Sequence, residues 1–117
     1  MELAHVLHHL GAFLTLCLGA FGLLRPGAAG HLIGLEPRAR LGGSELRATY
    51  GGLFAALGAF ALATRDEVAF TALGAAWLGS AAARMGDALL LGGERRIWRA
   101  ALFEGGMALL LLVPTPT

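Results

Sequence analysis

Residues Ser44–Ala63, SELRATYGGLFAALGAFALA, carry the pattern that decides the fold. The stretch begins with a glutamate and an arginine, passes a tyrosine and two glycines, and then runs apolar to its end. Its length is close to the roughly 20 residues that a helix needs to cross the hydrocarbon core of a bilayer. We therefore interpret it as a membrane span that carries part of a buried charged site.

Composition supports a membrane protein. The chain has 117 residues, enough for one domain, of which 56% are hydrophobic and 15% charged. An ordinary soluble domain has about 25% charged residues, and a small chain has a large surface for its volume. Some apolar surface should therefore face lipid. The net charge of +1 gives no indication of a nucleic-acid partner.

Four segments qualify, or nearly qualify, as membrane spans within a single transmembrane domain covering residues 1–117. They are about 3–24, 44–63, 68–91 and 97–113. Helices are expected because an open sheet edge would leave backbone groups unsatisfied in lipid. The predicted fold is an all-α integral membrane bundle of four helices. Its longer first link contains either a short interfacial helix over residues 28–35 or a surface loop.

Arginine counts predict the orientation of these spans. Six arginines lie in or beside the first and third links and one lies in the second. The first and third links should therefore be cytoplasmic, with both termini outside a bacterial cytoplasmic (inner) membrane. The N-terminal segment carries Glu2 and no lysine or arginine, so we expect a retained span rather than a cleaved signal.

Small residues line one face of the second span and one face of the third. Such residues allow close helix approach in lipid, so these faces are expected to touch or to form a homo-oligomer. They are Gly52, Ala56, Ala59 and Ala63 on one span, and Ala75, Gly79, Ala82, Ala83 and Gly86 on the other.

Five charged residues from three spans fall at one depth, in the cytoplasmic third of the membrane. They are Glu45, Arg47, Arg84, Asp87 and Glu104. A charge in mid-membrane costs about 2.5–3.5 kcal/mol, so these groups should turn inward and pair. Three acids against two arginines leave one carboxylate unmatched, and a buried acid of this kind is a candidate general acid or base. Catalytic roles are predicted for Glu45, Asp87 and Glu104.

Helical spacing suggests a binding surface around these acids. Trp77, Ser80, Arg84 and Asp87 form one stripe of the third span, while Arg47 and Phe54 share a face of the second, beside Tyr50. The predicted substrate-binding residues are Arg47, Tyr50, Phe54, Trp77, Ser80 and Arg84. No cofactor or metal is expected. His5 and His9 have a spacing that a metal could use, but interfacial polar residues are the preferred interpretation of these histidines and His8.

Structural interpretations of the same residues stay open. Glu45 would suit a helix N-terminus, where the dipole favours an anion. Arg47 would suit contact with lipid phosphate, and Tyr50 and Trp77 would suit plain packing. Arg84, Asp87 and Glu104 would also suit an ion network that only ties helices together.

The run Glu45-x-Arg47-x-x-Tyr50-Gly51-Gly52, followed by Ala83-Arg84 and Glu104-Gly105, resembles a known family. It is similar to the small bacterial four-helix membrane proteins catalogued as domain of unknown function four-three-four-five and, more distantly, to DoxX-like membrane proteins. The resemblance covers most of the chain and implies a four-helix membrane fold without implying an activity. At the level of architecture alone, the chain is similar to sterol isomerases and membrane-bound terpene cyclases.

The function expected from these features is binding or conversion of an apolar isoprenoid-, sterol- or quinone-like small molecule. Conversion would be a cofactor-free isomerisation or cyclisation by proton transfer. One alternative is a structural or accessory membrane subunit whose buried charges hold the helices together. Another is a protomer of a small proton-linked transporter.

Overall fold

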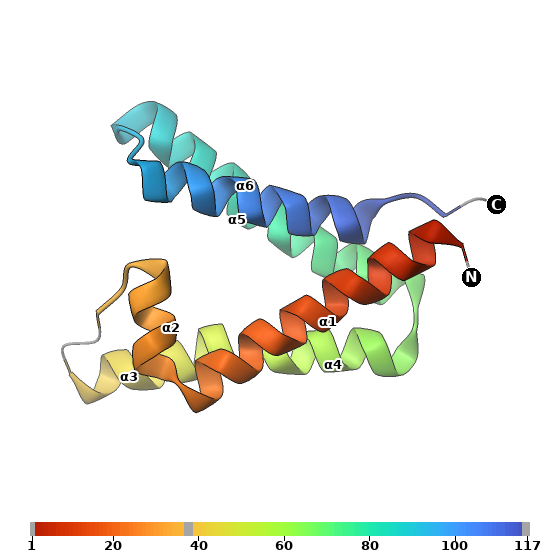
Figure 1. Cartoon of the computed structure of the whole chain (residues 1–117), viewed down its shortest axis with the longest axis horizontal. Coiled ribbons are helices and arrows are strands. Elements are labelled where there is room, and N and C mark those ends of the chain that lie inside the picture. The colour runs from red at the N-terminus through yellow and green to blue at the C-terminus, as the bar shows by residue number, and fades with distance from the viewer. Residues whose placement is uncertain (1, 37–38, 116–117) are drawn as a thin grey trace. The chain divides into compact units, whose positions relative to one another are not determined.

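The computed structural model describes residues 2–36 and 39–115, which are helical and contain no strand (Figure 1). The predicted all-α class is confirmed. In chain order the elements are α1 (Leu3–Leu24), α2 (Pro26–Ile33), α3 (Arg40–Arg47), the π-helix η1 (Ala48–Leu53), α4 (Phe54–Thr64), α5 (Glu67–Leu91) and α6 (Arg95–Leu112).

The first link contains the short helix that was one of its two predicted forms. Pro26 starts α2, where a missing N–H and a fixed φ cost nothing. Gly34 ends it with φ 83°, a left-handed conformation that favours glycine. The Leu35 N–H then donates to the Gly30 carbonyl oxygen at 2.7 Å, which closes the helix end.

The second predicted span is one run of helix, Arg40–Thr64, with the π-helical segment η1 in its middle. It begins at Arg40 rather than at Ser44, so Glu45 lies in its second turn and the first turn of α3 holds no acidic residue. The interpretation of Glu45 as a helix-terminal anion is therefore wrong.

Two helices in the described part of the chain are long and apolar enough to cross a membrane. They are Leu3–Leu24, with 22 residues and mean hydropathy 1.7, and Arg40–Thr64, with 25 residues and mean hydropathy 1.3. Soluble core helices and signal sequences also reach these values. α5 and α6 match the bounds of the third and fourth predicted spans but do not pass this test. Arg84 and Asp87 in α5, and three arginines and Glu104 in α6, lower their hydropathy.

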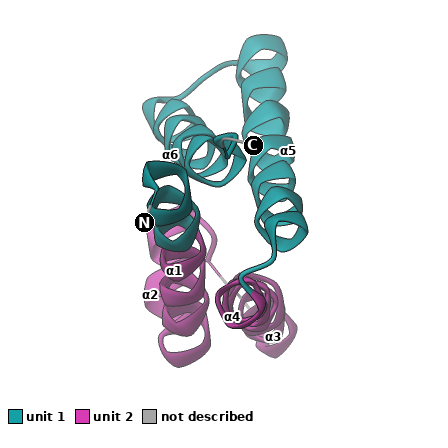
Figure 2. Ribbon diagram, turned by 90° about the vertical axis from the view of Figure 1, so that its right-hand side faces the viewer, with its two compact units in different colours: residues 1–11, 65–117 teal, residues 12–64 magenta. Residues whose placement is uncertain are grey.

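The chain divides into two compact units (Figure 2). The first unit comprises residues 1–11 and 65–117, and the second comprises residues 12–64. In the first unit α5 and α6 form an antiparallel pair whose core includes Phe70, Trp77 and Leu111. The second unit contains the rest of α1 together with α2, α3, η1 and α4.

Close helix packing in the second unit depends on glycines of α1, η1 and α4. A Cβ added to Gly22 would overlap the Tyr50 carbonyl oxygen, and one on Gly51 would lie 2.8 Å from the Leu23 nitrogen. Farther along, a Cβ on Gly58 would lie 2.6 Å from the Leu16 nitrogen. Glycine is required at these positions because the backbone of α1 approaches the backbones of η1 and α4 without room for a side chain.

Within each unit, the predicted small-residue faces are not the closely packed ones. A Cβ added to Gly79 or Gly86 would meet nothing within 4 Å. Seven of the nine residues are exposed and two are half-buried; the exposed ones are Ala56, Ala59, Ala63, Ala75, Gly79, Ala82 and Ala83. The physical reason is that alanine and glycine are frequent throughout this chain, so spacing alone does not select the face that packs.

Candidate functional site

A buried carboxylate joins α5 to α6 in the first unit. Glu104 of α6 is 7% exposed. The Ser80 hydroxyl donates to its Oε2 at 2.5 Å, and Arg84 Nε donates to its Oε1 at 2.5 Å. Both carboxylate oxygens are thus engaged by α5, which stabilises the charge in an apolar helix pair.

Local helix geometry explains this cluster. Ser80 and Arg84 are four residues apart, so they project from the same side of α5. Trp77 lies one turn earlier and is buried, with its ring edge-on to Phe103 of α6 at a centroid distance of 6.0 Å. The structure therefore brings Ser80 and Arg84 of one stripe to Glu104, while Trp77 of the same stripe packs against the neighbouring Phe103.

Asp87 does not join this cluster, although helical spacing put it on the same stripe. It is exposed, and it forms no ion pair within residues 2–36 and 39–115. Arg84, the arginine nearest to Asp87 in the sequence of α5, directs its Nε to Glu104 instead. Of the five charged residues predicted to lie together, this unit pairs Arg84 with Glu104, and Ser80 joins them through its hydroxyl.

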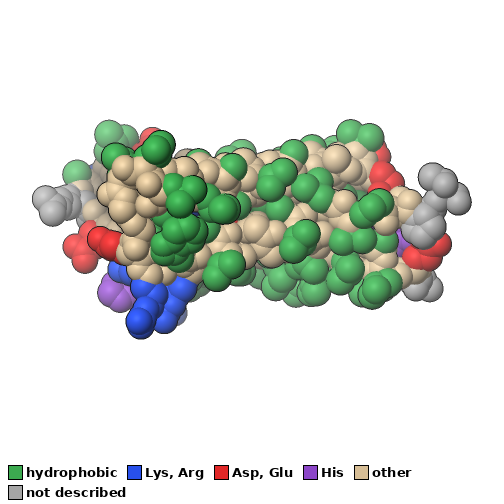
Figure 3. All heavy atoms as spheres, turned by 90° about the horizontal axis from the view of Figure 1, so that it is seen from above, with side chains coloured by type: hydrophobic (Ala, Val, Ile, Leu, Met, Phe, Trp, Pro, Cys, Tyr) green, Lys and Arg blue, Asp and Glu red, His purple; other side chains and the backbone are tan. Residues whose placement is uncertain are grey.

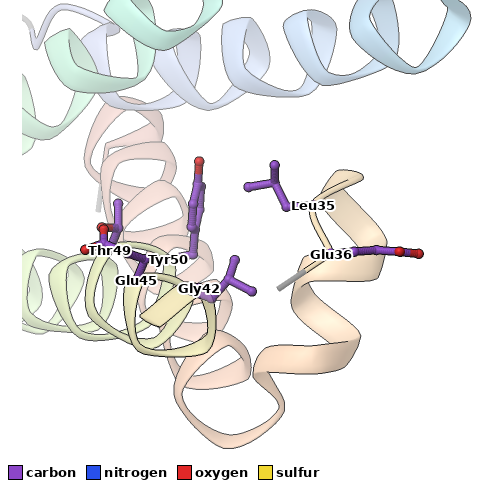
Figure 4. A pocket seen from close by; sticks show the side chains of 7 residues that line it. Leu35, Glu36, Gly42, Glu45, Thr49 and Tyr50 are labelled. Atoms are coloured by element: carbon purple, nitrogen blue, oxygen red, sulfur yellow. The ribbon is translucent and has the colours of Figure 1, made fainter. Parts of the chain in front are cut away.

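The second unit contains an open recess of about 400 Å³ beside the π-helical segment (Figure 4). The described residues that line it are Leu35, Glu36, Gly42, Glu45, Leu46, Thr49 and Tyr50. Tyr50 and Leu35 lie on opposite sides, and the Glu36 side chain extends away (Figure 4). Glu45 and Tyr50 are the two sequence-predicted site residues that line it.

Four of the lining residues lie on one face of the same helix and form one wall of the recess. Gly42, Glu45, Leu46 and Thr49 follow at i, i+3, i+4 and i+7, the spacing of a single helix face. This pattern could have been found in the sequence if the helix had been started at Arg40. Tyr50 follows in the π-helix, whose wider i→i+5 bonding is common at functional sites.

The other two predicted binding residues of this unit lie outside the recess lining. Arg47 is exposed. Phe54 packs its ring against Tyr50 at a centroid distance of 5.9 Å, so it supports a wall of the recess. The face that Arg47 and Phe54 were predicted to share assumed regular α periodicity, which η1 interrupts between them.

Histidines at the start of α1 form a polar cluster in the first unit that the sequence did not predict. His8 is 2% exposed, and its Nε2 donates to the Val113 carbonyl oxygen at 2.7 Å. Its Nδ1 lies 3.6 Å from one Glu67 oxygen, and His5 Nε2 lies 3.4 Å from the other. No group of three or more ligating side chains within the described residues has a geometry that would hold a metal ion.

Comparison with protein-family models, curated proteins and solved structures finds no match to this chain. The chemistry that each site allows therefore comes from its own residues. The Glu104 cluster is closed, since its hydrogen bonds are satisfied by protein groups. The recess is open and presents a carboxylate, two hydroxyls and apolar side chains, which suits a small amphiphilic molecule.

Proposed function

We propose that this chain is a small polytopic membrane protein that binds an apolar isoprenoid-, sterol- or quinone-like molecule in the recess beside Glu45 and Tyr50. The observation that carries the proposal is the composition of that recess. Leu35 and Leu46 offer an apolar surface, while Glu45, Thr49 and Tyr50 supply polar atoms that would orient one end of a ligand. Apolar pockets with a few placed polar groups are typical of small-molecule sites.

Exposed apolar surface supports a membrane location. Only 33% and 22% of the most apolar windows of Leu3–Leu24 and Arg40–Thr64 are buried, unlike the core helix of a soluble protein. Hydrophobic side chains dominate the face seen in Figure 3, and charged ones form a few small groups. Large apolar side chains more than 70% exposed occur in both units: Leu3, Leu24, Leu41, Val68, Leu89, Leu90, Leu91, Leu102 and Leu109. Surface of this extent supports the proposed contact with lipid.

The proposed topology has four spans, with α5 and α6 as the third and fourth, and both termini outside. The arginine bias supports it, as does the E-x-R-x-x-Y-G-G run through which we propose membership of the four-three-four-five family. The recess would then lie near the cytoplasmic interface, where a ligand can keep its polar end near water and its body in lipid.

Conversion of the ligand by proton transfer is a narrower form of the proposal. Glu104 is a poor choice of acid or base because Ser80 and Arg84 engage both of its oxygens. Glu45 lines the recess, so acid–base chemistry on a bound molecule would belong to this carboxyl group.

Photo-crosslinking tests the binding proposal. The protein would be reconstituted in phosphatidylcholine nanodiscs and irradiated with a clickable diazirine analogue of geranylgeraniol. Thr49→Trp should fill the recess and remove most of the labelling. Ala48→Trp should leave the labelling intact, because Ala48 is the exposed neighbour that does not line the recess. Equal labelling of the unmodified protein and both variants would overturn the proposal.

A structural or accessory membrane subunit is the second candidate, and the Glu104 cluster favours it. A buried acid held by two donors from the facing helix fixes the register of α5 and α6 without any ligand. The exposed small-residue faces would then be available to a second copy of the chain.

A further inference from the structure

We infer that the molecule bound in the recess carries a cationic nitrogen at its polar end. The inference rests on the proposed function and specifies the ligand class for that site. Its first basis is the charge of the recess. The described lining residues include carboxylates and no basic side chain.

Glu45 has no cation to neutralise it within the described residues. The nearest arginine in the described sequence is Arg47, which sits two positions further along the helix. A Cβ on Gly43 would lie 3.8 Å from Arg47 Nη1, so the guanidinium runs back along the turn toward Gly43. Gly43 and Arg47 share a face at i, i+4, and that face is not the one of Glu45 and Thr49.

The groups beside Glu45 suit a cation. The Tyr50 ring stands upright at the recess (Figure 4), and the face of a tyrosine ring attracts an ammonium group electrostatically. The Thr49 and Tyr50 hydroxyls add lone pairs that accept hydrogen bonds from N–H donors. A phosphate or carboxylate head group would meet the Glu45 charge at close range and be repelled.

Competition among three ligands that share one hydrocarbon chain and differ only in the head group tests the inference. Geranylgeranylamine, geranylgeraniol and geranylgeranic acid would compete with the diazirine probe in nanodiscs of neutral lipid. We expect the amine to compete about tenfold better than the alcohol, and the acid to compete worst. Glu45→Gln should remove the preference for the amine. Glu94→Gln should preserve it, because Glu94 is an exposed acid of the first unit and does not line the recess.

The outcomes separate this inference from the proposed function. If the alcohol or the acid displaces the probe from the unmodified protein as well as the amine does, the inferred cationic head group is wrong and the proposed binding site is unaffected. If none of the three displaces the probe, the proposed function itself fails. The comparison within the unmodified protein is decisive even if Glu45→Gln fails to fold.

Discussion

Glu104 shows how a single residue can be charged and buried in so apolar a chain. Ionised carboxylates are rarely buried unless paired, and this one receives both a hydroxyl and a guanidinium donor from α5. The Arg84 side chain is 33% exposed, so its remaining N–H groups can reach the surroundings while Nε holds Glu104.

Removing that carboxylate should destabilise the helix pair. Glu104→Ala leaves Arg84 and Ser80 without their acceptor, and we expect a loss of about 1–3 kcal/mol in the free energy of unfolding. Ser80→Ala should cost about 1 kcal/mol. Thermal unfolding in detergent, followed by circular dichroism, would measure both.

Asp87→Asn is the matched control for these variants. Asp87 is an exposed acid on α5, so its neutralisation should change stability by less than about 0.5 kcal/mol. If the Glu104→Ala protein has the same melting temperature as the Asp87→Asn protein, the cluster does not hold α5 to α6.

At the residue scale, the sequence predicted that Arg84 and Glu104 turn inward and pair, because a charge deep in an apolar helix must find a partner, whereas Ser80 was predicted to bind a substrate and not to hold Glu104. The prediction that Asp87 joins this cluster is wrong, because helical spacing gives the direction in which a side chain points but not whether a partner lies in that direction. Sequence reasoning also missed His8, whose partner Val113 lies 105 positions away in the chain and offers only a backbone carbonyl. No pattern of residue types signals such a contact.

The π-helical segment is the element that shapes the recess. Propensity does not explain it, because Gly51 and Gly52 only weaken a helix. At this segment α1 approaches so closely that the Tyr50 carbonyl lies against Gly22. Helix bounds could be predicted from apolar length and turn residues, whereas this contact between segments distant in the chain could not.

Adding a methyl group at that contact should therefore disturb the recess. Gly22→Ala would drive a Cβ into the Tyr50 carbonyl, so we expect a lower melting temperature and weaker labelling by the diazirine probe. Gly79→Ala is the control, because its Cβ would meet nothing within 4 Å and alanine favours a helix by about 1 kcal/mol. If Gly22→Ala melts and labels like the unmodified protein, packing against α1 does not set the position of Tyr50.

The four-span membrane topology is the central claim at the scale of the whole molecule. Two helices are long and apolar enough to cross a membrane, and α5 and α6 carry large exposed apolar side chains that the proposed topology would place in lipid. A two-span protein would instead keep α5 and α6 on one side of the membrane. The two arrangements differ in where the link between α5 and α6 lies.

Site-specific labelling of introduced cysteines measures this difference directly. In a Cys17→Ala background, the single substitutions Gly27→Cys, Arg65→Cys and Glu94→Cys each place one thiol in one of the three links. Reaction with a membrane-impermeant maleimide then shows on which side of the membrane each link lies. Four spans predict that residue 65 reacts from outside, and that residues 27 and 94 react only after the membrane is opened. Reaction of residue 94 from the same side as residue 65 would contradict the four-span topology.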